Sequence, residues 1–389
     1  MTRIETIDAH TAGEPLRLIV SGFPTVGGAT ILEQREFVRE HYDHLRRALM
    51  LEPRGHADMY GALLTPPEHP GSHAGVLFMH NEGYSTMCGH GVIAVTTIAI
   101  ERNLILLPRE ADGTVRLTLD SPAGPIYATA VLDGVAQGIS PANDVGRGED
   151  VRHGDDMRRG DDVRRGDDVG RGFTPASPRV KSVRFRNVPS FVLHAAVPVM
   201  VGTREVRADV AFGGAFYAIV DSEAVGIPIA PTRLAELRKA GMEIKHAIEK
   251  TLKVEHPLEP QLHGIYGTIF TGPPSDDTAD LRNVTIFADA EVDRSPCGTG
   301  TAAVMAVLAA MGMLSEGEQV FTHESIIGTK FRGRVVETTT LSAPNLKLQT
   351  PNDNELDAII PEIEGSAYIT GENAFLIDDR DPMKHGFRL

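Results

Sequence analysis

The sequence predicts an α/β fold built from two halves of similar construction. At 389 residues the chain has room for two globular domains, each with its own hydrophobic core. Short strands alternate with helical segments through both halves. The phrase Cys-Gly-x-Gly, followed by an apolar stretch of helical character, occurs at Cys88-Gly89-His90-Gly91 and again at Cys297-Gly298-Thr299-Gly300. A strand, this loop and a buried helix are therefore expected once in each half.

The first half is predicted to lead from a pair of strands to the first cysteine loop. Residues 4–9 and 16–20 are expected to be short strands, and residues 33–50 have the spacing and charge pattern of a helix. Residues 75–80 form a predicted strand that runs into the loop at Cys88. Residues 114–120 alternate polar and apolar side chains, as a half-buried strand does.

The second half repeats this organisation up to Cys297. Its expected elements are strands at 191–201, 207–212 and 216–220, a helix at 232–250, and strands at 265–271 and 283–290. The last of these strands runs into the second cysteine loop, which an apolar helical stretch at 301–314 follows. We interpret the recurrence as an ancient duplication with little sequence left in common.

A low-complexity tract at residues 147–172 separates the halves. It repeats Gly-Asp-Asp-Val-Arg-Arg and close variants with a period of six. Such a tract is dense in charge and poor in apolar residues, so it cannot bury enough surface to offset its ordering entropy. Gly/Asp repeats also bind calcium in parallel β-rolls, but the arginine pairs would neutralise the carboxylates and the repeat length differs. We expect a flexible, solvated insertion without a part in catalysis.

Composition and charge narrow the class of protein. The formal net charge is −15, without long Lys/Arg blocks, which argues against nucleic acid or an anionic membrane as a partner. The N-terminus carries charges where a signal peptide needs an apolar run. The apolar stretch at 301–314 is shorter than the roughly 20 residues needed to span a bilayer. Two cysteines in a chain this long form no disulfide framework, so a reducing, cytoplasmic setting is expected.

The two cysteines are the candidate catalytic groups. A thiol just before a helix N-terminus faces unpaired N–H groups and the positive end of the helix dipole, so we expect its pKa to fall toward neutrality. Cys88 and Cys297 would then be matched bases on opposite faces of one substrate, which is the chemistry of proton exchange at a carbon centre. Free cysteine also serves as a small buried hydrophobe. A redox pair is disfavoured because there is no Cys-x-x-Cys, and a metal site because no histidine lies at ligand spacing from Cys297.

Other polar groups near the cysteines are candidates for binding. His90 and Thr299 occupy matching places in the two phrases, and either would hydrogen-bond a substrate or orient a thiol. Asp293 would pair with a cationic amine, or else cap backbone amides in its loop. Polar stretches at 8–17 and 53–61 would line a cleft, although a buried hydrogen-bond network is the default interpretation. No phosphate-binding glycine loop, dinucleotide fingerprint or Schiff-base lysine is present, so no cofactor and no metal are expected.

These phrases closely resemble the signatures of the proline racemase family. The similarity is carried by residues 87–91 and 293–300, and it extends to residues 8–15, 53–56, 187–191, 212–217, 323–329 and 369–387. It covers nearly the whole chain except the six-residue repeats. The family also includes hydroxyproline 2-epimerases and trans-3-hydroxyproline dehydratases.

The resemblance implies a diaminopimelate-epimerase-like fold, with two pseudo-symmetric domains that each wrap a curved sheet around a central helix. The active site would lie between them. Catalysis would need no cofactor and would use Cys88 and Cys297 as a thiol/thiolate pair acting on a small cyclic amino acid. Asp293 and His90 would contact the ring nitrogen of the substrate. The amides that would bind its carboxylate are those of Gly89, His90, Gly298 and Thr299.

The resemblance also implies an arrangement of the chain. One lobe would comprise residues 1–125 with 366–389 and carry Cys88, because the end of the chain returns to the first domain. The other lobe would comprise residues 126–365 and carry Cys297. Two copies would form a homodimer.

Within the family, the residue at the second cysteine position separates the reactions. Racemases and epimerases need a proton donor and acceptor on both faces, whereas dehydratases typically carry threonine at this position. Cys297 therefore favours a racemase or 2-epimerase that inverts Cα of proline or a hydroxyproline. The sequence at 83–94 and 265–270 is closer to the dehydratase branch, and two thiols do not prevent elimination. A trans-3-hydroxy-L-proline dehydratase yielding Δ1-pyrroline-2-carboxylate is the alternative.

Overall fold

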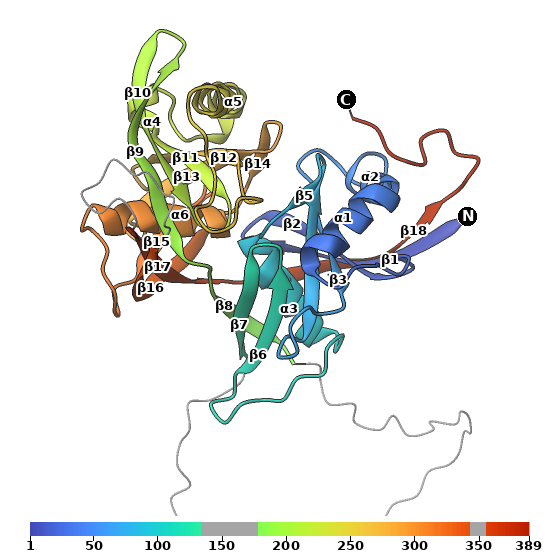
Figure 1. Cartoon of the computed structure of the whole chain (residues 1–389). Helices are drawn as coiled ribbons and strands as arrows, with labels where there is room; N and C mark the ends of the chain where they lie inside the picture. Colours follow the sequence, from blue (N-terminus) through green and yellow to red (C-terminus); the bar gives the residue numbers. More distant parts are fainter. Residues whose placement is uncertain (134–177, 343–354, 389) are drawn as a thin grey trace, which may run out of the picture.

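The computed structural model describes residues 1–133, 178–342 and 355–388. Its strands form one hydrogen-bonded network of 18 strands. The network curves into two lobes that lie side by side, one formed mainly by the blue and teal segments and the other by the green to orange segments (Figure 1). The predicted α/β class is confirmed.

The first half of the chain contributes nine strands and three helices to this structure. They are β1 (Thr2–Thr11), β2 (Glu14–Ser21), α1 (Ile31–His41), α2 (Asp43–Met50), β3 (Tyr60–Thr65), β4 (Ala74–His80), β5 (Tyr84–Ser85), α3 (Gly89–Glu101), β6 (Val115–Ser121), β7 (Gly124–Leu132), β8 (Val180–Arg186) and β9 (Ser190–Val201).

The second half of the chain contributes the other nine strands. They and their helices are β10 (Arg204–Phe212), β11 (Phe216–Asp221), α4 (Ser222–Val225), the 3₁₀ turn η1 (Pro231–Arg233), α5 (Leu234–Thr251), β12 (Gly267–Gly272), β13 (Leu281–Phe287), β14 (Glu291–Asp293), α6 (Gly298–Ala310), β15 (Phe321–Glu324), β16 (Lys330–Ser342), β17 (Glu355–Gly365) and β18 (Ala367–Ile377).

The strand pairings of the two halves correspond when nine is added to each strand number. β1 pairs antiparallel with β2, β2 parallel with β3 and β3 antiparallel with β4, and β10 to β13 repeat the same pattern. β4 pairs parallel with β6 as β13 does with β15. The halves exchange their last strands, because β9 pairs with β10 and β18 pairs with β1. The repeated construction predicted from the two cysteine phrases is confirmed.

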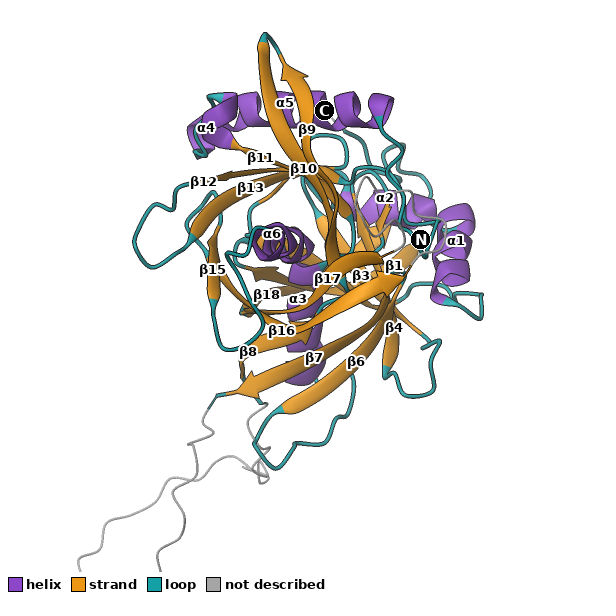
Figure 2. Cartoon of the chain, turned by 60° about the vertical axis from the view of Figure 1, so that its left-hand side comes forward, coloured by secondary structure: helices purple, strands orange, loops and turns teal. Residues whose placement is uncertain are grey.

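One apolar helix occupies the centre of each lobe. Every residue of α3 from Gly89 to Ile100 is buried, as is every residue of α6 from Gly298 to Val307. Strands surround both helices (Figure 2). A helix that is apolar on all sides is stable only when it is enclosed in this way, so the composition of the two stretches explains their central position. Each helix is thereby held rigidly by the lobe that carries its cysteine.

The predicted helix at 33–50 is wrong in one respect, since two helices, α1 and α2, meet at Tyr42. The backbone of Tyr42, with φ −128° and ψ 12°, ends the first helix and begins the second. The turn lets the Arg46 guanidinium reach the carbonyl oxygens of His80 (2.7 Å) and Asn81 (2.6 Å). No glycine or proline marks the break, so the spacing of apolar residues did not reveal it.

The other expected strands and the helix near 232–250 are present, with ends that shift by a few residues. The strand expected at 283–290 ends at Phe287, and the short strand β14 intervenes before the second cysteine. The predicted insertion at 147–172 lies outside the described residues. The lobe boundaries at 125/126 and 365/366 stay a prediction, although β18 does return to pair with β1. In the described part of the chain, no helix combines the length and apolar character needed to cross a membrane.

Candidate active site

The two cysteines occupy equivalent positions at the starts of the central helices. Cys88 is the N-cap of α3, and its Sγ accepts the N–H of Gly91 at 3.3 Å. Cys297 is the N-cap of α6, and its Sγ accepts the N–H of Gly300 at 3.3 Å. Each thiol therefore takes the position that a capping hydroxyl or carboxylate usually takes. The predicted helix-opening context of both cysteines is confirmed.

The N-termini of the two helices meet at the first glycine of each phrase. A Cβ built on Gly89 would lie 2.5 Å from the Cα of Gly298, which is closer than any real contact of this kind. Only glycine permits this approach. In the structure these glycines let the two helix ends touch. Cys88 and Cys297, one residue before them, are thus brought together from the two lobes.

The predicted polar groups surround Cys88 on one side of this contact. The Cys88 Sγ lies 3.2 Å from Nδ1 of His90. The same nitrogen lies 3.9 Å from a carboxylate oxygen of Asp293, which β14 contributes from the other half of the chain. Asp293 also accepts hydrogen bonds from the N–H (2.8 Å) and hydroxyl (2.6 Å) of Ser295, so it caps its loop and faces His90 at once. His90 and Asp293 are both buried.

Cys297 has a different set of neighbours. Thr299 Oγ1 lies 3.8 Å from the Cys297 Sγ and 2.6 Å from the hydroxyl of Tyr217. The Tyr217 hydroxyl is 3.7 Å from the Cys297 Sγ. Tyr217 was not among the predicted site residues, because nothing in the spacing of β11 shows that its hydroxyl reaches the start of α6. The seven predicted site residues form one cluster: Cys88, Gly89, His90, Asp293, Cys297, Gly298 and Thr299.

The polar stretches at residues 8–17 and 53–61 both support the segment that precedes Cys297. Glu14 accepts the N–H of Arg294 at 2.8 Å. Asp58 accepts the N–H of Val292 at 3.2 Å and the guanidinium of Arg238 at 2.6 Å. The interpretation of these stretches as buried hydrogen-bond networks is confirmed for these carboxylates, which also tie the first half of the chain to the second.

The pKa values of both thiols are raised, whereas we predicted from the sequence that they would fall. Burial raises the pKa of Cys88 well above its usual value and that of Cys297 to about 12. At Cys88 the N–H of Gly91 lowers the pKa and the charge of Asp293 raises it, each by less than burial does. At Cys297 the charge of Asp293 raises the pKa, whereas hydrogen bonds from Tyr217 and from the N–H of Gly300 lower it by less. The prediction that the helix ends bring these pKa values toward neutrality is therefore wrong. Burying a thiolate away from water costs more free energy than the hydrogen bonds at the helix N-terminus return. Both cysteines are therefore neutral thiols at pH 7.

The side chain of His90 is also neutral. Burial lowers its pKa, although the nearby carboxylate of Asp293 opposes this shift. A neutral imidazole has one donor and one acceptor nitrogen, so His90 is able to exchange a hydrogen bond with the Cys88 thiol. In the described residues, no group of three or more His, Cys, Asp or Glu side chains is arranged to hold a metal ion.

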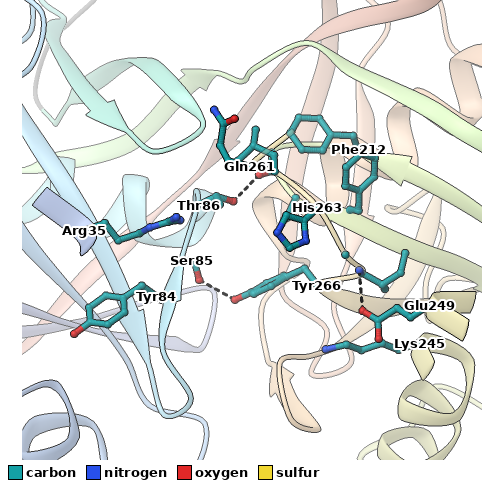
Figure 3. A pocket seen from close by; sticks show the side chains of 16 residues that line it. Arg35, Tyr84, Ser85, Thr86, Phe212, Lys245, Glu249, Gln261, His263 and Tyr266 are labelled. Atoms are coloured by element: carbon teal, nitrogen blue, oxygen red, sulfur yellow. Dashed lines mark hydrogen bonds between the residues drawn. The ribbon is translucent and has the colours of Figure 1, made fainter. Parts of the chain in front are cut away.

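A cavity of about 420 Å³ opens between the lobes, and none of the seven predicted site residues is among those that line it. Figure 3 shows Tyr84, Ser85 and Thr86 on its wall from the first half of the chain, and Lys245, His263 and Tyr266 from the second. A dashed line in the figure joins Ser85 to Tyr266, whose hydroxyls are 2.9 Å apart. The cavity is large enough for a small amino acid or several water molecules.

Sequence comparisons identify relatives along the full length of the chain. Residues 6–142 and 171–388 match the family described as proline racemase. A trans-3-hydroxy-L-proline dehydratase from Bacillus thuringiensis is 43% identical over 99% of this chain and 97% of its own. A 3-hydroxyproline 2-epimerase from Burkholderia multivorans is 38% identical, with the same coverage. A proline racemase from Clostridioides difficile is 36% identical over 99% of this chain and 98% of its own.

Comparison with solved structures agrees with this assignment. A hydroxyproline epimerase from Agrobacterium vitis, crystallised with trans-4-hydroxy-L-proline, superposes with a TM-score of 0.79 at 27% identity, covering 100% of this chain and 95% of its own. A probable proline racemase from Agrobacterium radiobacter K84 gives 0.78 at 29% identity, covering 99% and 96%. The predicted diaminopimelate-epimerase-like fold is confirmed. By its sequence over nearly all of its length, the chain belongs to the proline racemase family.

Proposed function

We propose that this protein is a cofactor-independent racemase or 2-epimerase that inverts Cα of proline or a hydroxyproline. Cys88 and Cys297 are the two catalytic groups in this proposal, one acting as thiolate and the other as thiol. The observation that carries it is the contact between Gly89 and Gly298, because that contact joins the N-termini of the two helices that Cys88 and Cys297 cap. Two bases on opposite faces of a planar carbanion are what inversion requires.

The helix ends supply the other requirement, which is to stabilise the substrate carboxylate as negative charge spreads into it. Backbone N–H groups at helix N-termini bind anions. In the proposal the carboxylate lies against the amides of the first turns of α3 and α6: Gly89, His90, Gly298 and Thr299. Their buried position excludes water, which strengthens each of these hydrogen bonds.

The raised thiol pKa values are consistent with this mechanism if the substrate itself activates the thiols. Asp293 raises the pKa of both Cys88 and Cys297 through its negative charge. The ring nitrogen of a bound cyclic amino acid is cationic, and we place it beside Asp293 and His90. A cation there offsets the carboxylate and favours thiolate formation only when substrate is bound. The resting thiols are thereby kept unreactive toward oxidants.

A dehydratase acting on trans-3-hydroxy-L-proline is the second candidate. It is favoured by the 43% identity to the Bacillus thuringiensis relative of that name. Elimination needs proton abstraction from Cα on one face only, followed by departure of the 3-hydroxyl. One of the two thiols would then suffice as base, and the neighbouring His90 is placed to assist a proton transfer.

Incubation in D₂O with L-proline, trans-4-hydroxy-L-proline and trans-3-hydroxy-L-proline tests both candidates. The isomerase places deuterium at Cα and yields the inverted centre, as read by proton NMR and chiral chromatography. The dehydratase converts only the 3-hydroxylated substrate, and the product is Δ1-pyrroline-2-carboxylate. Absence of Cα exchange and of elimination with every one of these amino acids would contradict the proposal.

Cys297→Ser and Cys88→Ser separate the roles of the thiols. Loss of either base abolishes inversion, whereas elimination survives the loss of the thiol that it does not use. Serine keeps a capping oxygen at the helix start, so both variants are expected to remain folded, which a denaturant titration checks. Equal, unimpaired inversion by either variant would exclude the two-thiol mechanism.

Two further expectations belong to the proposal. The protein is expected to form a homodimer, which light scattering measures. It is also expected to act without a cofactor or metal, so dialysis against a chelator should leave its activity unchanged.

A further inference from the structure

The backbone at the second cysteine differs from that at the first. Cys297 has a positive φ of 61°, whereas the φ of Cys88 is −146°. A residue with a side chain keeps a positive φ only where the surrounding structure imposes it. The turn before Cys297 is also longer. Ser85 and Asp293 end the strands β5 and β14, and two residues separate Ser85 from Cys88, whereas three separate Asp293 from Cys297.

Hydrogen bonds hold both sides of the peptide bond between Pro296 and Cys297. The carbonyl oxygen of Pro296 accepts hydrogen bonds from Oγ1 of Thr301 at 3.1 Å and from Nδ2 of Asn283 at 3.2 Å. The N–H of Cys297 donates to Oγ of Ser295 at 3.1 Å. Turning this peptide plane over would carry φ of Cys297 to a negative value. The hydrogen bonds that fix the plane therefore also fix the positive φ.

His323 joins the two side chains that hold the carbonyl oxygen. Its Nδ1 lies 2.9 Å from Oγ1 of Thr301, and its Nε2 lies 2.9 Å from Nδ2 of Asn283. Burial lowers the pKa of His323 to about 3, so the ring is neutral and has one donor and one acceptor nitrogen. Because the Thr301 hydroxyl donates to Pro296, it accepts from Nδ1–H, while Nε2 accepts from the amide. We call Asn283, Thr301 and His323 the polar clamp.

The first half of the chain has apolar residues where the second half has the polar clamp. Leu119 is the first residue of β6 that pairs with β4, as His323 is the first residue of β15 that pairs with β13. The other positions correspond as the third residues of β4 and β13 and as the residues four places after each cysteine. The counterparts are thus Val76 for Asn283, Val92 for Thr301 and Leu119 for His323, and all six residues are fully buried.

This difference separates the needs of the fold from the needs of one turn. Buried polar side chains lose their hydration, and only hydrogen bonds offset that loss. The first half shows that the same scaffold accepts three apolar side chains at these positions. The polar clamp accompanies the features that distinguish the second half, which are the longer turn and the positive φ of Cys297.

We propose that Asn283, Thr301 and His323 are positioning residues that hold the Cys297 thiol in its catalytic orientation by fixing the peptide before it. This inference rests on the proposed function, in which Cys297 is one of the two bases. The three side chains act through the carbonyl oxygen of Pro296 rather than on the substrate.

The fixed peptide is also linked to Asp293. The Ser295 Oγ, which accepts the Cys297 N–H, donates its own hydrogen to a carboxylate oxygen of Asp293 at 2.6 Å. If the peptide plane turned over, the carbonyl oxygen of Pro296 would point toward these oxygen atoms in place of the N–H. The polar clamp therefore supports both the thiol and the loop of the carboxylate that we place beside the substrate nitrogen.

Thr301→Val and Thr301→Ser test the polar clamp in opposite directions. Valine keeps the shape of threonine and removes the hydroxyl, whereas serine keeps the hydroxyl and removes the methyl group. Because a displacement of about 1 Å at a reacting group lowers the rate by about 100-fold, we expect a loss of kcat for inversion of this size in Thr301→Val. KM should stay close to the wild-type value, since the amides of the first turn of α6 remain in place. Thr301→Ser should keep a kcat close to that of the wild type.

A role in packing alone predicts the reverse order. Valine would then be the active variant, because it fills the same volume, and serine would be the impaired one. That ranking, or an unimpaired kcat in Thr301→Val, would overturn the polar clamp.

A triple variant gives the second half the residues of the first: Asn283→Val, Thr301→Val and His323→Leu. It removes the three polar side chains together, so none of them is left buried without its partner. Its midpoint in urea denaturation should be close to that of the wild type, and its kcat should be as low as that of Thr301→Val. A wild-type kcat in the folded triple variant would overturn the proposal, and the two Thr301 variants decide the question if the triple variant does not fold.

Thr97→Val is the matched control. Thr97 is a buried threonine of the other central helix, and its hydroxyl donates to the carbonyl oxygen of Ile93 within that helix at 2.8 Å. Its kcat should be unchanged, and an equal loss in this variant would overturn the specific role of Thr301. A wild-type enzyme that inverts none of the tested amino acids overturns the proposed function itself. An inverting wild type with an unimpaired Thr301→Val variant overturns the polar clamp alone.

Discussion

Replacing Gly89 by alanine tests the contact on which the proposed active site depends. The substitution keeps the backbone N–H that we assign to carboxylate binding and adds only one methyl group. That methyl group would lie 2.5 Å from the Cα of Gly298 and 3.0 Å from Cζ of Phe185. The first of these neighbours is backbone at the start of a buried helix, so it cannot move aside as a flexible side chain does.

The size of the effect follows from these distances. Carbon atoms in contact are about 3.5–4.0 Å apart, so α3 and α6 must separate by about 1 Å or more at their N-termini. Overpacking of a buried site destabilises a protein by about 1–3 kcal/mol. A displacement of about 1 Å between reacting groups lowers the rate by about 100-fold. We therefore expect Gly89→Ala to fold, with a reduced free energy of unfolding and a kcat about two orders of magnitude lower.

Urea denaturation and the Cα exchange assay in D₂O measure the two effects on one sample. Gly71→Ala is the control, because a Cβ at Gly71 meets nothing within 4 Å. Its free energy of unfolding and kcat should match those of the wild type. Wild-type values for Gly89→Ala would show that the helix ends are not in contact in solution, and the proposed pairing of Cys88 with Cys297 would lose its structural basis.

Three other predictions follow from the cluster and its supports. Iodoacetamide should alkylate Cys297 slowly at pH 7, and the alkylation rate should rise about tenfold per pH unit without a plateau up to pH ~10, because the pKa of Cys297 is about 12, whereas an unperturbed thiol has a pKa of about 8.5. Mass spectrometry of quenched samples measures this rate. A plateau near pH 9 would contradict the raised pKa. Tyr217→Phe removes the hydroxyl that lies 2.6 Å from Thr299 Oγ1 and with it a hydrogen bond that lowers the pKa of Cys297. We therefore expect the free energy of unfolding to fall by about 1 kcal/mol and kcat to fall as well. An unchanged kcat would show that this hydroxyl does not support the thiol. Asp8→Ala removes the carboxylate that lies 2.8 Å from the buried guanidinium of Arg17. We expect the free energy of unfolding, measured by urea denaturation, to fall by about 3 kcal/mol. A fall of less than about 1 kcal/mol would mean that the carbonyl partners of Arg17 alone stabilise the buried guanidinium.

The sequence predicted the elements whose residue pattern is local. Alternation identified β6, and the all-apolar stretches after each Cys-Gly-x-Gly phrase identified α3 and α6 as buried helices. The repeated phrase also indicated the internal symmetry. Each of these strands and helices is encoded within about 15 consecutive residues, which is the range over which periodicity carries information.

What the sequence did not predict depends on contacts between distant segments. The exchange of β9 and β18 between the halves was implied only by the family resemblance, because periodicity does not specify pairing partners. Tyr217 reaches the site from a strand with no motif of its own. The thiol pKa values were predicted in the wrong direction because burial, a property of the whole fold, outweighs the helix end, which is a local one.

The symmetry of the scaffold explains why there are two cysteines that cap helices. In the proposed mechanism, the departures from this symmetry determine which reaction the two thiols carry out. His90 follows Cys88 at the position where Thr299 follows Cys297. The equilibrium constant between two enantiomers is one, so unequal neighbours cannot favour one product of a racemase. In the proposed mechanism they instead determine which thiol becomes the thiolate when substrate binds, and hence which enantiomer is deprotonated first. For a 3-hydroxylated substrate the same inequality also separates the group that abstracts the Cα proton from the group that protonates the leaving hydroxyl. Positions 90 and 299 are therefore where we expect the choice between inversion and elimination to be encoded, and exchanging His90 and Thr299 should change the ratio of the two products on trans-3-hydroxy-L-proline.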